Sequence, residues 1–481
     1  MEEVLEQNHH DVGRPVLKLA DPDLDVNPVS CLERALAALR DDVVVMSGSH
    51  ATPHPVDLLD VETRIGVRVG EIARAATQHV LASLMPRAGT ITVDGIAYQR
   101  LNQVTVGRYG TMFGEVEVAR PLFREVGVRN GRTVDVIAAR GGIRDGFTPR
   151  AETGIALAVQ AMPAREAHGV CAALGVLPYS RSTFQRVPER VGERWHAVAD
   201  EVRPTLSWSE DALERAVAIA VEVDRVATPM AEPRELTPTD TARGVRRPVN
   251  VAWRMSFYGD LVLLDADGAV VDTLRHAQVA DGGHGAVVAS MRAELDAAVK
   301  RVPQLRIATL ANGAQEMQGM LEEITEGREV TARLVDLWHL LRYVREAGNA
   351  LGVDVEHLVS GIFTYRHGID DLEAWVEEQV RDLRDKAPRA LLDAHRYLEN
   401  KRHLIDYYSA RETGVPIGSG HVEATCKTIV SVRFKRAGAR WSRDGAQHLL
   451  ALRALAQSGD RWRPTMTGMY EREAHDVSWA A

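Results

Sequence analysis

The sequence predicts an α/β protein, and two observations support this prediction. From Arg215 onward, short apolar runs of strand length alternate with amphipathic segments of helix length. Before that, residues 90 to 140 show the alternation of apolar and polar residues that is typical of antiparallel strands. At roughly 150 residues per domain, a chain of 481 residues has room for two to four domains. We therefore expect the α/β region to be one of several domains.

The composition is that of an ordinary globular protein, with 45% hydrophobic and 26% charged residues. No apolar run approaches the roughly 18 residues of a membrane helix, and Met1 to Val4 lack the layout of a secretory signal. We therefore expect a soluble, cytoplasmic protein. Cys31, Cys171 and Cys426 lie too far apart for a zinc ribbon or a disulfide framework, which indicates reduced thiols.

Charge is distributed unevenly along the chain. Residues 1–60 hold 12 acidic and 4 basic side chains, so they contribute −8 of the net charge of −9. We interpret them as an acidic, partly ordered extension with one helical stretch near Cys31 to Leu39. By contrast, Lys427 to Arg443 contains six basic residues and no acidic one. Such a cluster can neutralise phosphates, although it is also what a solvated helix face looks like.

Residues 61–150 are predicted to form a helix and a small β module. Apolar residues recur at helical spacing from Ile65 to Leu84, and three alternating segments follow between glycines. Residues 151–205 then contain a predicted helix over Ala164–Leu174, a turn, and a second helix capped by Ser180.

If this helix-turn-helix binds DNA, the start of its second helix contacts the bases and the backbone. The residues in that position are Arg181, Ser182, Thr183, Gln185 and Arg186. The alternative is a packed helical hairpin without a ligand, which is the commoner structure.

Residues 206–340 carry the α/β pattern. Strands are predicted over Ala216–Val223, Val249–Tyr258, Leu261–Leu264, Val270–Leu274, Leu305–Leu310 and Val330–Val335, with a helix over Val287–Val299. Three of these strands end at Asp224, near Asn312 and at Asp336. Residues 341–413 are predicted to be helical. Residues 414–463 begin with a glycine-rich turn before the helix of Glu423 and the basic cluster, and 464–481 form a tail.

Carboxylates at strand ends, with another on a helix, suit a pair of divalent metal ions that cut and join nucleic-acid strands. The candidates are Asp224, Asn312 or Asp336, and Glu423, and their oxygen ligands favour Mg²⁺ or Mn²⁺. For each acid taken alone, the alternative is a turn or cap residue. His339 is as compatible with a structural role as with a functional one, and Cys426 is expected to be a packed thiol.

Several motifs also carry a resemblance. The segments Pro416–Lys427, Arg433–Trp441 and Leu452–Leu455 resemble the C-terminal signature of bacterial insertion-sequence transposases of the ISKra group. The sequences around Asp224 and Asn312 are similar to the first two catalytic strands of that group. The run Asp336-Leu-Trp-His339 resembles an element shared with Mutator-like transposases. The resemblance covers residues 90 to 463.

The resemblance implies a ribonuclease-H-like catalytic domain of DDE type, interrupted by an all-helical insertion and preceded by a DNA-binding region. It makes Asp224 the first metal carboxylate and Glu423 the third. The family has Asp at the second position, where this chain has Asn312. Because an amide has no charge and one carbonyl oxygen, it cannot replace a carboxylate that bridges two cations. Asp336 and His339 are expected to line the site, either orienting a DNA strand, moving a proton or bracing the insertion.

The predicted function is therefore a DNA transposase with a two-metal Mg²⁺ or Mn²⁺ site, impaired by Asn312. Its partners are double-stranded DNA, at element ends and at the target, and at least one further copy of the chain; when bound to DNA it lies at the nucleoid. Lys427, Arg433, Lys435, Arg436 and Arg440 are expected to follow the DNA backbone. The alternatives are a transposase-derived DNA-binding protein that does not cut, and an unrelated α/β enzyme.

Overall fold

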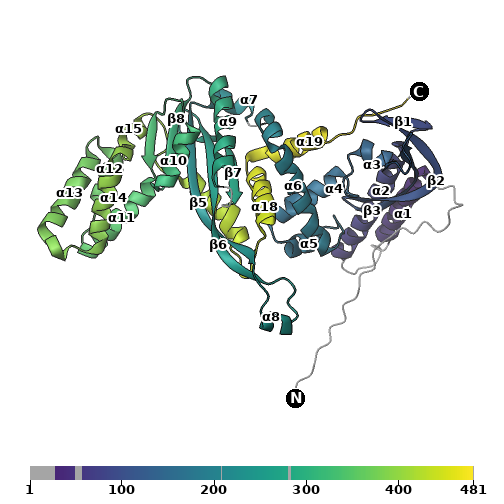
Figure 1. Cartoon of the computed structure of the whole chain (residues 1–481), viewed down its shortest axis with the longest axis horizontal. Coiled ribbons are helices and arrows are strands. Elements are labelled where there is room, and N and C mark those ends of the chain that lie inside the picture. Colours follow the sequence, from purple (N-terminus) through teal and green to yellow (C-terminus); the bar gives the residue numbers. More distant parts are fainter. Residues whose placement is uncertain (1–27, 49–56, 207, 280–282, 480–481) are drawn as a thin grey trace, which may run out of the picture. The chain divides into compact units, whose positions relative to one another are not determined.

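The computed structural model describes residues 28–48, 57–206, 208–279 and 283–479, and the chain divides into two compact units (Figure 1). The first unit holds the described residues up to Ile155, Ala164–Phe184, and those from Tyr470 onward. The second holds Ala156–Pro163 and Gln185–Met469. The segment 151–205 is thus shared between the units. Most of the predicted extension 1–60 lies outside the described residues, and none of the helices they form has the length and apolar character needed to cross a membrane.

The first unit contains an antiparallel sheet of order β10-β1-β2-β3-β4. The helix predicted from Ile65 is confirmed as part of α2, and the small β module is present as strands β1 to β4 of this sheet. The fifth strand, β10, pairs with β1 and comes from the segment 464–481, which was predicted to be a tail. The elements of this unit are α1 (Pro28–Gly48), α2 (Leu58–Ser83), β1 (Thr90–Val93), β2 (Ile96–Thr111), β3 (Gly114–Glu125), β4 (Thr133–Val134), α3 (Val136–Gly141) and β10 (Val477–Ser478).

The predicted helix-turn-helix is confirmed as secondary structure. The helices are α4 (Pro149–Ala161), α5 (Ala164–Ala173) and α6 (Arg181–Leu206). Ser180 precedes α6, and its Oγ lies 3.4 Å from the backbone nitrogen of Thr183, as the predicted cap requires.

The second unit contains a mixed sheet of order β7-β6-β5-β8-β9. β5 pairs antiparallel with β6 and parallel with β8, and β8 pairs parallel with β9. The α/β prediction is therefore confirmed at this level. The strands are β5 (Ala218–Pro233), β6 (Val249–Leu264), β7 (Val270–Val279), β8 (Arg306–Ala311) and β9 (Ala332–Val335).

Several strand boundaries differ from the prediction, including the end of β7 at Val279 instead of Leu274, and the two largest differences concern β5 and β6. β5 does not end at Asp224: its pairing with β8 stops at Glu222, but its pairing with β6 continues to Pro233. The two strands predicted before and after Gly259 are one strand, β6. Gly259 does not break the strand, because it gives room to Met291, whose sulfur would lie 2.1 Å from a Cβ atom added there.

Helices cover both faces of this sheet. On one face, β5 residues Ile219, Val221 and Val223 pack in an apolar core with Met291 and Leu295. The elements on this side are α7 (Glu210–Arg215), α9 (Gly285–Arg301) and α10 (Gln315–Ile324).

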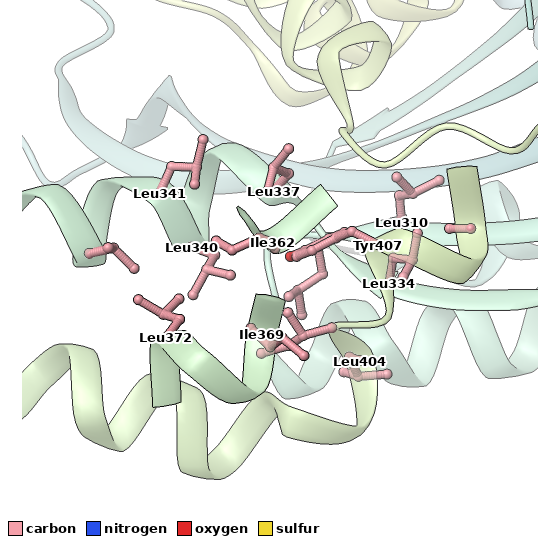
Figure 2. Close-up of a cluster of buried hydrophobic side chains, with 14 of the residues drawn as sticks. Leu310, Leu334, Leu337, Leu340, Leu341, Ile362, Ile369, Leu372, Leu404 and Tyr407 are labelled. Atoms are coloured by element: carbon pink, nitrogen blue, oxygen red, sulfur yellow. The ribbon is translucent and has the colours of Figure 1, made fainter. Parts of the chain in front are cut away.

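The opposite face is covered by two groups of elements. The first is the predicted helical stretch, whose leucine-rich core includes Leu310, Leu334 and Leu340 (Figure 2). It comprises α11 (Leu337–Leu351), α12 (Glu356–Thr364), α13 (Gly368–Leu383), η3 (Arg384–Lys386), α14 (Arg389–Lys401), η4 (Arg402–Leu404) and α15 (Tyr407–Glu412). The second comprises α16 (Gly420–Thr425), the π-helical turn η5 (Cys426–Ser431), α17 (Val432–Phe434), α18 (Arg443–Ala456) and η6 (Gly459–Arg461). The chain then continues as α19 (Trp462–Arg472). One further short helix, α8 (Pro238–Ala242), joins β5 to β6.

Candidate active site and nucleic-acid interface

Asp224 and Asn312, predicted to be the first two metal-binding positions, lie in contact. Asp224 lies on β5 just beyond its last pair with β8, and Asn312 directly follows β8. The Asn312 Nδ2 donates to Asp224 Oδ1 at 3.0 Å, and Asn312 Oδ1 accepts from the backbone N–H of Ala314 at 2.9 Å. Gly313 turns the chain here with φ +81°, a left-handed conformation that favours glycine. Both residues lie where the pairing of the parallel strands β5 and β8 ends, and their side chains are therefore close enough to contact each other.

The surroundings of Asp224 raise its pKa. Burial is the main cause, and the N–H of Arg225, the thiol of Cys426 and the charge of His339 act in the opposite direction on the pKa. Cys426 is buried, as predicted for a packed thiol, but its Sγ also lies 3.5 Å from Asp224 Oδ2. Burial and the neighbouring Asp224 raise the pKa of this thiol, so Cys426 is a protonated neighbour of the carboxylate.

Asp336 is a fully buried N-cap residue of α11. Its Oδ1 accepts from the N–H of Trp338 at 2.7 Å, and its Oδ2 accepts from the hydroxyl of Ser419. His339 Nδ1 lies 3.6 Å from Asp336 Oδ2, an ion-pair distance that is too long for a hydrogen bond. Burial acts to raise the pKa of Asp336, but these neighbours outweigh it and hold the pKa below its usual value. Asp336 therefore caps α11 with Oδ1 and connects it through Oδ2 to Ser419, at the start of α16.

Glu423 lies on α16 and is exposed. Within the described chain, its carboxylate makes no hydrogen bond to Asp224 or Asn312. Cys426, which does contact Asp224, follows Glu423 by three residues, and residues at this spacing lie on neighbouring positions of a helical surface. Glu423 therefore lies one turn before the contact between Cys426 and Asp224. Ser419 begins this helix but does not cap it, because its hydroxyl is directed to Asp336.

Two buried acids beneath α16 were not predicted as site residues. Glu222 precedes Asp224 by two residues and therefore faces the same side of β5, and its register partner on β6 is Asp260. Glu222 Oε2 accepts from the N–H of Val422 at 2.9 Å, and Asp260 Oδ2 accepts from the hydroxyl of Thr425 at 2.6 Å. These bonds attach α16 to the sheet. The available sequence signal was a charged residue inside the apolar run 216–223.

The side chains at Asp224 are an incomplete set for a pair of divalent ions. Asp224 supplies carboxylate oxygens, but Asn312 directs an N–H donor at the same carboxylate. Across the described ranges, no group of three or more His, Cys, Asp or Glu side chains is placed to hold a metal ion. As they stand, these residues do not fit a two-metal site. An aspartate at position 312 would remove the donor and add a second carboxylate.

The residues predicted to bind DNA at the start of α6 are mostly exposed. Arg181, Ser182, Gln185 and Arg186 face solvent, whereas Thr183 is buried. This division is typical of an amphipathic helix, with its polar face accessible.

In the basic segment, Lys427, Lys435, Arg436 and Arg440 are exposed. Arg433 is only 7% exposed: its Nε lies 3.4 Å from the carbonyl oxygen of Val159, and its guanidinium lies 4.8 Å from the ring centre of Trp441. Arg433 therefore packs inside the second unit, and four of the five predicted cations remain accessible to a phosphate backbone.

Comparisons with known proteins give few matches. No protein-family model and no curated protein sequence matches the chain. Among solved structures, the chain is similar to a Drosophila P element transposase strand transfer complex, at 11% identity and a TM-score of 0.24. That similarity covers 70% of this chain and 82% of the other. It is too low to support an argument about function.

Proposed function

We propose that this protein is a transposase-type DNA-binding protein with a ribonuclease-H-like domain of DDE type, whose strand cleavage is impaired by Asn312. The observation that carries the proposal is the contact between Asp224 and Asn312 at the point where β5 and β8 separate. Predicted from sequence motifs 88 residues apart, these two side chains lie at hydrogen-bond distance.

The architecture of the second unit supports the proposed domain. A mixed sheet with helices on both faces is followed by the helical stretch α11–α15, and the chain then returns to the sheet as α16. Glu222 and Asp260 hold α16 against β5 and β6, so Glu423 belongs to an element attached beside Asp224. This is the order of parts that the motifs imply.

The proposed chemistry is strand cleavage and strand transfer at DNA ends. In enzymes of the implied class this chemistry uses a pair of divalent ions held by three carboxylates. Of that set this chain supplies Asp224 and Glu423, and Asn312 occupies the position of the missing carboxylate, so strand cleavage by the unmodified chain is expected to be impaired. The exposed Lys427, Lys435 and Arg436 would position the DNA backbone. Asp336 would act as a brace between α11 and the Ser419 turn.

A second candidate function, DNA binding without cleavage, is favoured by one specific observation. The Asn312 amide donates a hydrogen bond to Asp224 and so satisfies that carboxylate without a cation. A protein that pairs or represses element ends needs the DNA-binding surface but not the metals.

The proposal is tested by measuring DNA strand cleavage by the unmodified protein and by the variant Asn312→Asp. The full-length protein, Asn312→Asp, and Asn312→Asp with Glu423→Gln are incubated with duplexes covering the DNA on both sides of the coding region, in Mg²⁺ and in Mn²⁺. We expect cleavage to rise by several powers of ten in Asn312→Asp, since each 1.36 kcal/mol of barrier is a factor of ten. The added Glu423→Gln should abolish it.

Each other result has a defined meaning. Equal cleavage by the unmodified protein would show that Asn312 is not at the second ligand position. Salt-sensitive DNA binding without cleavage by any variant would favour the second candidate function. Absence of DNA binding above a nonspecific background would overturn both.

A further inference from the structure

We infer that the tip of the β5–β6 hairpin is a second DNA-contacting surface, which binds phosphates about one helical turn away from Asp224. We call residues 225–257 the arm and residues 234–248 its tip. The inference rests on the proposed function and adds a contact that none of the motifs indicates.

The arm is an ordered extension of the sheet. β5 and β6 remain paired from Arg225 and Phe257 out to Pro233 and Val249, and α8 lies at their far end (Figure 1). Nine residues separate Asp224 from Pro233. At about 3.3 Å per strand residue, the tip lies roughly 30 Å from Asp224 along the strand.

Local hydrogen bonds fix the shape of the tip. Thr237 and Asp240 form a capping box at the start of α8, and Gly244 ends the turn after α8 with φ +67°. Arg234 forms a bidentate ion pair with Asp240, in which Nη1 donates to Oδ2 at 2.5 Å and Nη2 donates to Oδ1 at 2.8 Å. The hydrogen bond from Arg234 is the main reason that the pKa of Asp240 is lowered, so this acid stays ionised and paired.

Three arginines of the tip are left without an acidic partner. Arg254 pairs with Glu232, and Arg234 pairs with Asp240. Arg243, Arg246 and Arg247 are exposed and form no ion pair with any residue that the structure describes. What distinguishes these three cations is their close spacing, within five residues of a chain whose net charge is −9. Such a cluster suits an anionic partner.

The chemistry of these side chains favours DNA as that partner. A guanidinium group binds phosphate oxygens through two parallel N–H donors, and closely spaced arginines match the closely spaced charges of a DNA backbone. A length of roughly 30 Å corresponds to about nine base pairs at 3.4 Å each. A duplex whose scissile bond lies at Asp224 and which runs along the arm would therefore reach the tip.

A second copy of the chain is the competing partner. The arm carries exposed apolar side chains at Val251, Trp253 and Met255, on the face opposite to Asp224. They lie on the paired part of the arm, outside the tip. The arginines thus carry the inference for DNA, and self-association becomes an outcome of the test.

The test compares two variants that each remove three positive charges. One is Arg243→Gln with Arg246→Gln and Arg247→Gln. The control is Arg366→Gln with Arg384→Gln and Lys386→Gln, which changes three exposed cations of the helical stretch α11–α15. Neither variant touches Asp224, Asn312, Glu423 or the pair of Arg234 and Asp240. Circular dichroism should show both to be folded.

The measurement is the dissociation constant for a 30-base-pair duplex as a function of salt concentration. Each lost phosphate contact reduces the magnitude of the slope of log K against log salt by about 0.9. In the tip variant the magnitude of this slope should therefore be smaller by roughly 2 to 3 than in the unmodified protein. Its affinity at low salt should fall on the order of tenfold, and the control should match the unmodified protein.

The failure of this inference can be separated from failure of the proposed function. If the unmodified protein binds DNA and the two triple variants share its slope, the tip does not contact DNA and the proposed function stands. If sedimentation shows that the tip variant changes self-association and not the slope, the partner is a second copy and the inference is wrong. If the unmodified protein does not bind DNA, both are wrong.

Discussion

The two faces of the second unit's sheet differ although they belong to the same strands. On one face, β5 presents Ile219, Val221 and Val223 to an apolar core. On the other, it presents Ala220, then Glu222 and Asp224. Burying a carboxylate costs several kcal/mol unless hydrogen bonds compensate, whereas burying apolar side chains stabilises the fold. The first face is therefore stabilised by apolar packing, whereas the second combines an apolar core with buried acids whose burial hydrogen bonds must compensate.

The acidic face is only partly satisfied by its surroundings. Glu222 and Asp260 are fully buried, and each has one oxygen bonded to α16. The other oxygens, Glu222 Oε1 and Asp260 Oδ1, have no hydrogen-bond partner within the described structure. Incomplete satisfaction of this kind is uncommon in a purely structural core and is concentrated at functional sites.

The largest expected effect comes from weakening the apolar face. Leu261 is fully buried there, so Leu261→Ala should reduce the free energy of unfolding by about 2–5 kcal/mol. Urea unfolding followed by circular dichroism measures this change. DNA affinity of the folded fraction should be unchanged, since the substitution lies on the face away from Asp224. A loss below about 1 kcal/mol would contradict the assignment of stability to this face.

A medium effect is expected on the acidic face, and it depends on pH. Burial is the main reason that the pKa of Asp260 is raised to about 6 from 3.8. An acid with a raised pKa stabilises the folded state when protonated, so its contribution is complete below about pH 4 and is lost as pH rises through 6. From pH 4 to 7 this loss should be on the order of 2–3 kcal/mol.

Asp260→Asn isolates that contribution, because an amide cannot ionise and keeps an oxygen for Thr425. The free energy of unfolding is measured for both proteins at pH 4 and at pH 7. Between these two pH values the unmodified protein should lose more stability than Asp260→Asn. Identical pH dependence would show that Asp260 ionises as freely in the folded protein as in the unfolded chain.

The smallest effect is expected where a charge lies at the exposed edge of the apolar face. Arg225 on β5 pairs with Glu316 on α10, and both side chains are 36% exposed. Exposed pairs contribute little, so Arg225→Ala should cost less than about 1 kcal/mol. A double-mutant cycle with Glu316→Ala measures the coupling. A coupling above 2 kcal/mol would mean that this ion pair is much stronger than an exposed pair and would contradict the expected small effect.

The sequence predicted the order of elements well, because periodicity and glycine punctuation are local properties. The helix from Ile65, the β module, the helices flanking Ser180 and the helical stretch after Trp338 are present in the structure. The prediction was wrong where the decision is not local. Whether β5 ends at Asp224 or continues to Pro233 depends on β6, which lies beside it only after folding. Similarly, Gly259 interrupts the pattern of β6 but not the strand, since its role is to admit Met291.

For the site, the sequence alone determined residue types and their order along the chain: an acid at 224, an amide at 312, an acid at 336 and an acid at 423. Only the tertiary structure decided their contacts. It brings Asn312 to Asp224, commits Asp336 to capping α11, buries Arg433, and adds Glu222 and Asp260 beneath α16. The physical reason is that burial and hydrogen-bond partners are set by strand pairing and helix packing between segments far apart in the chain, which no local pattern records.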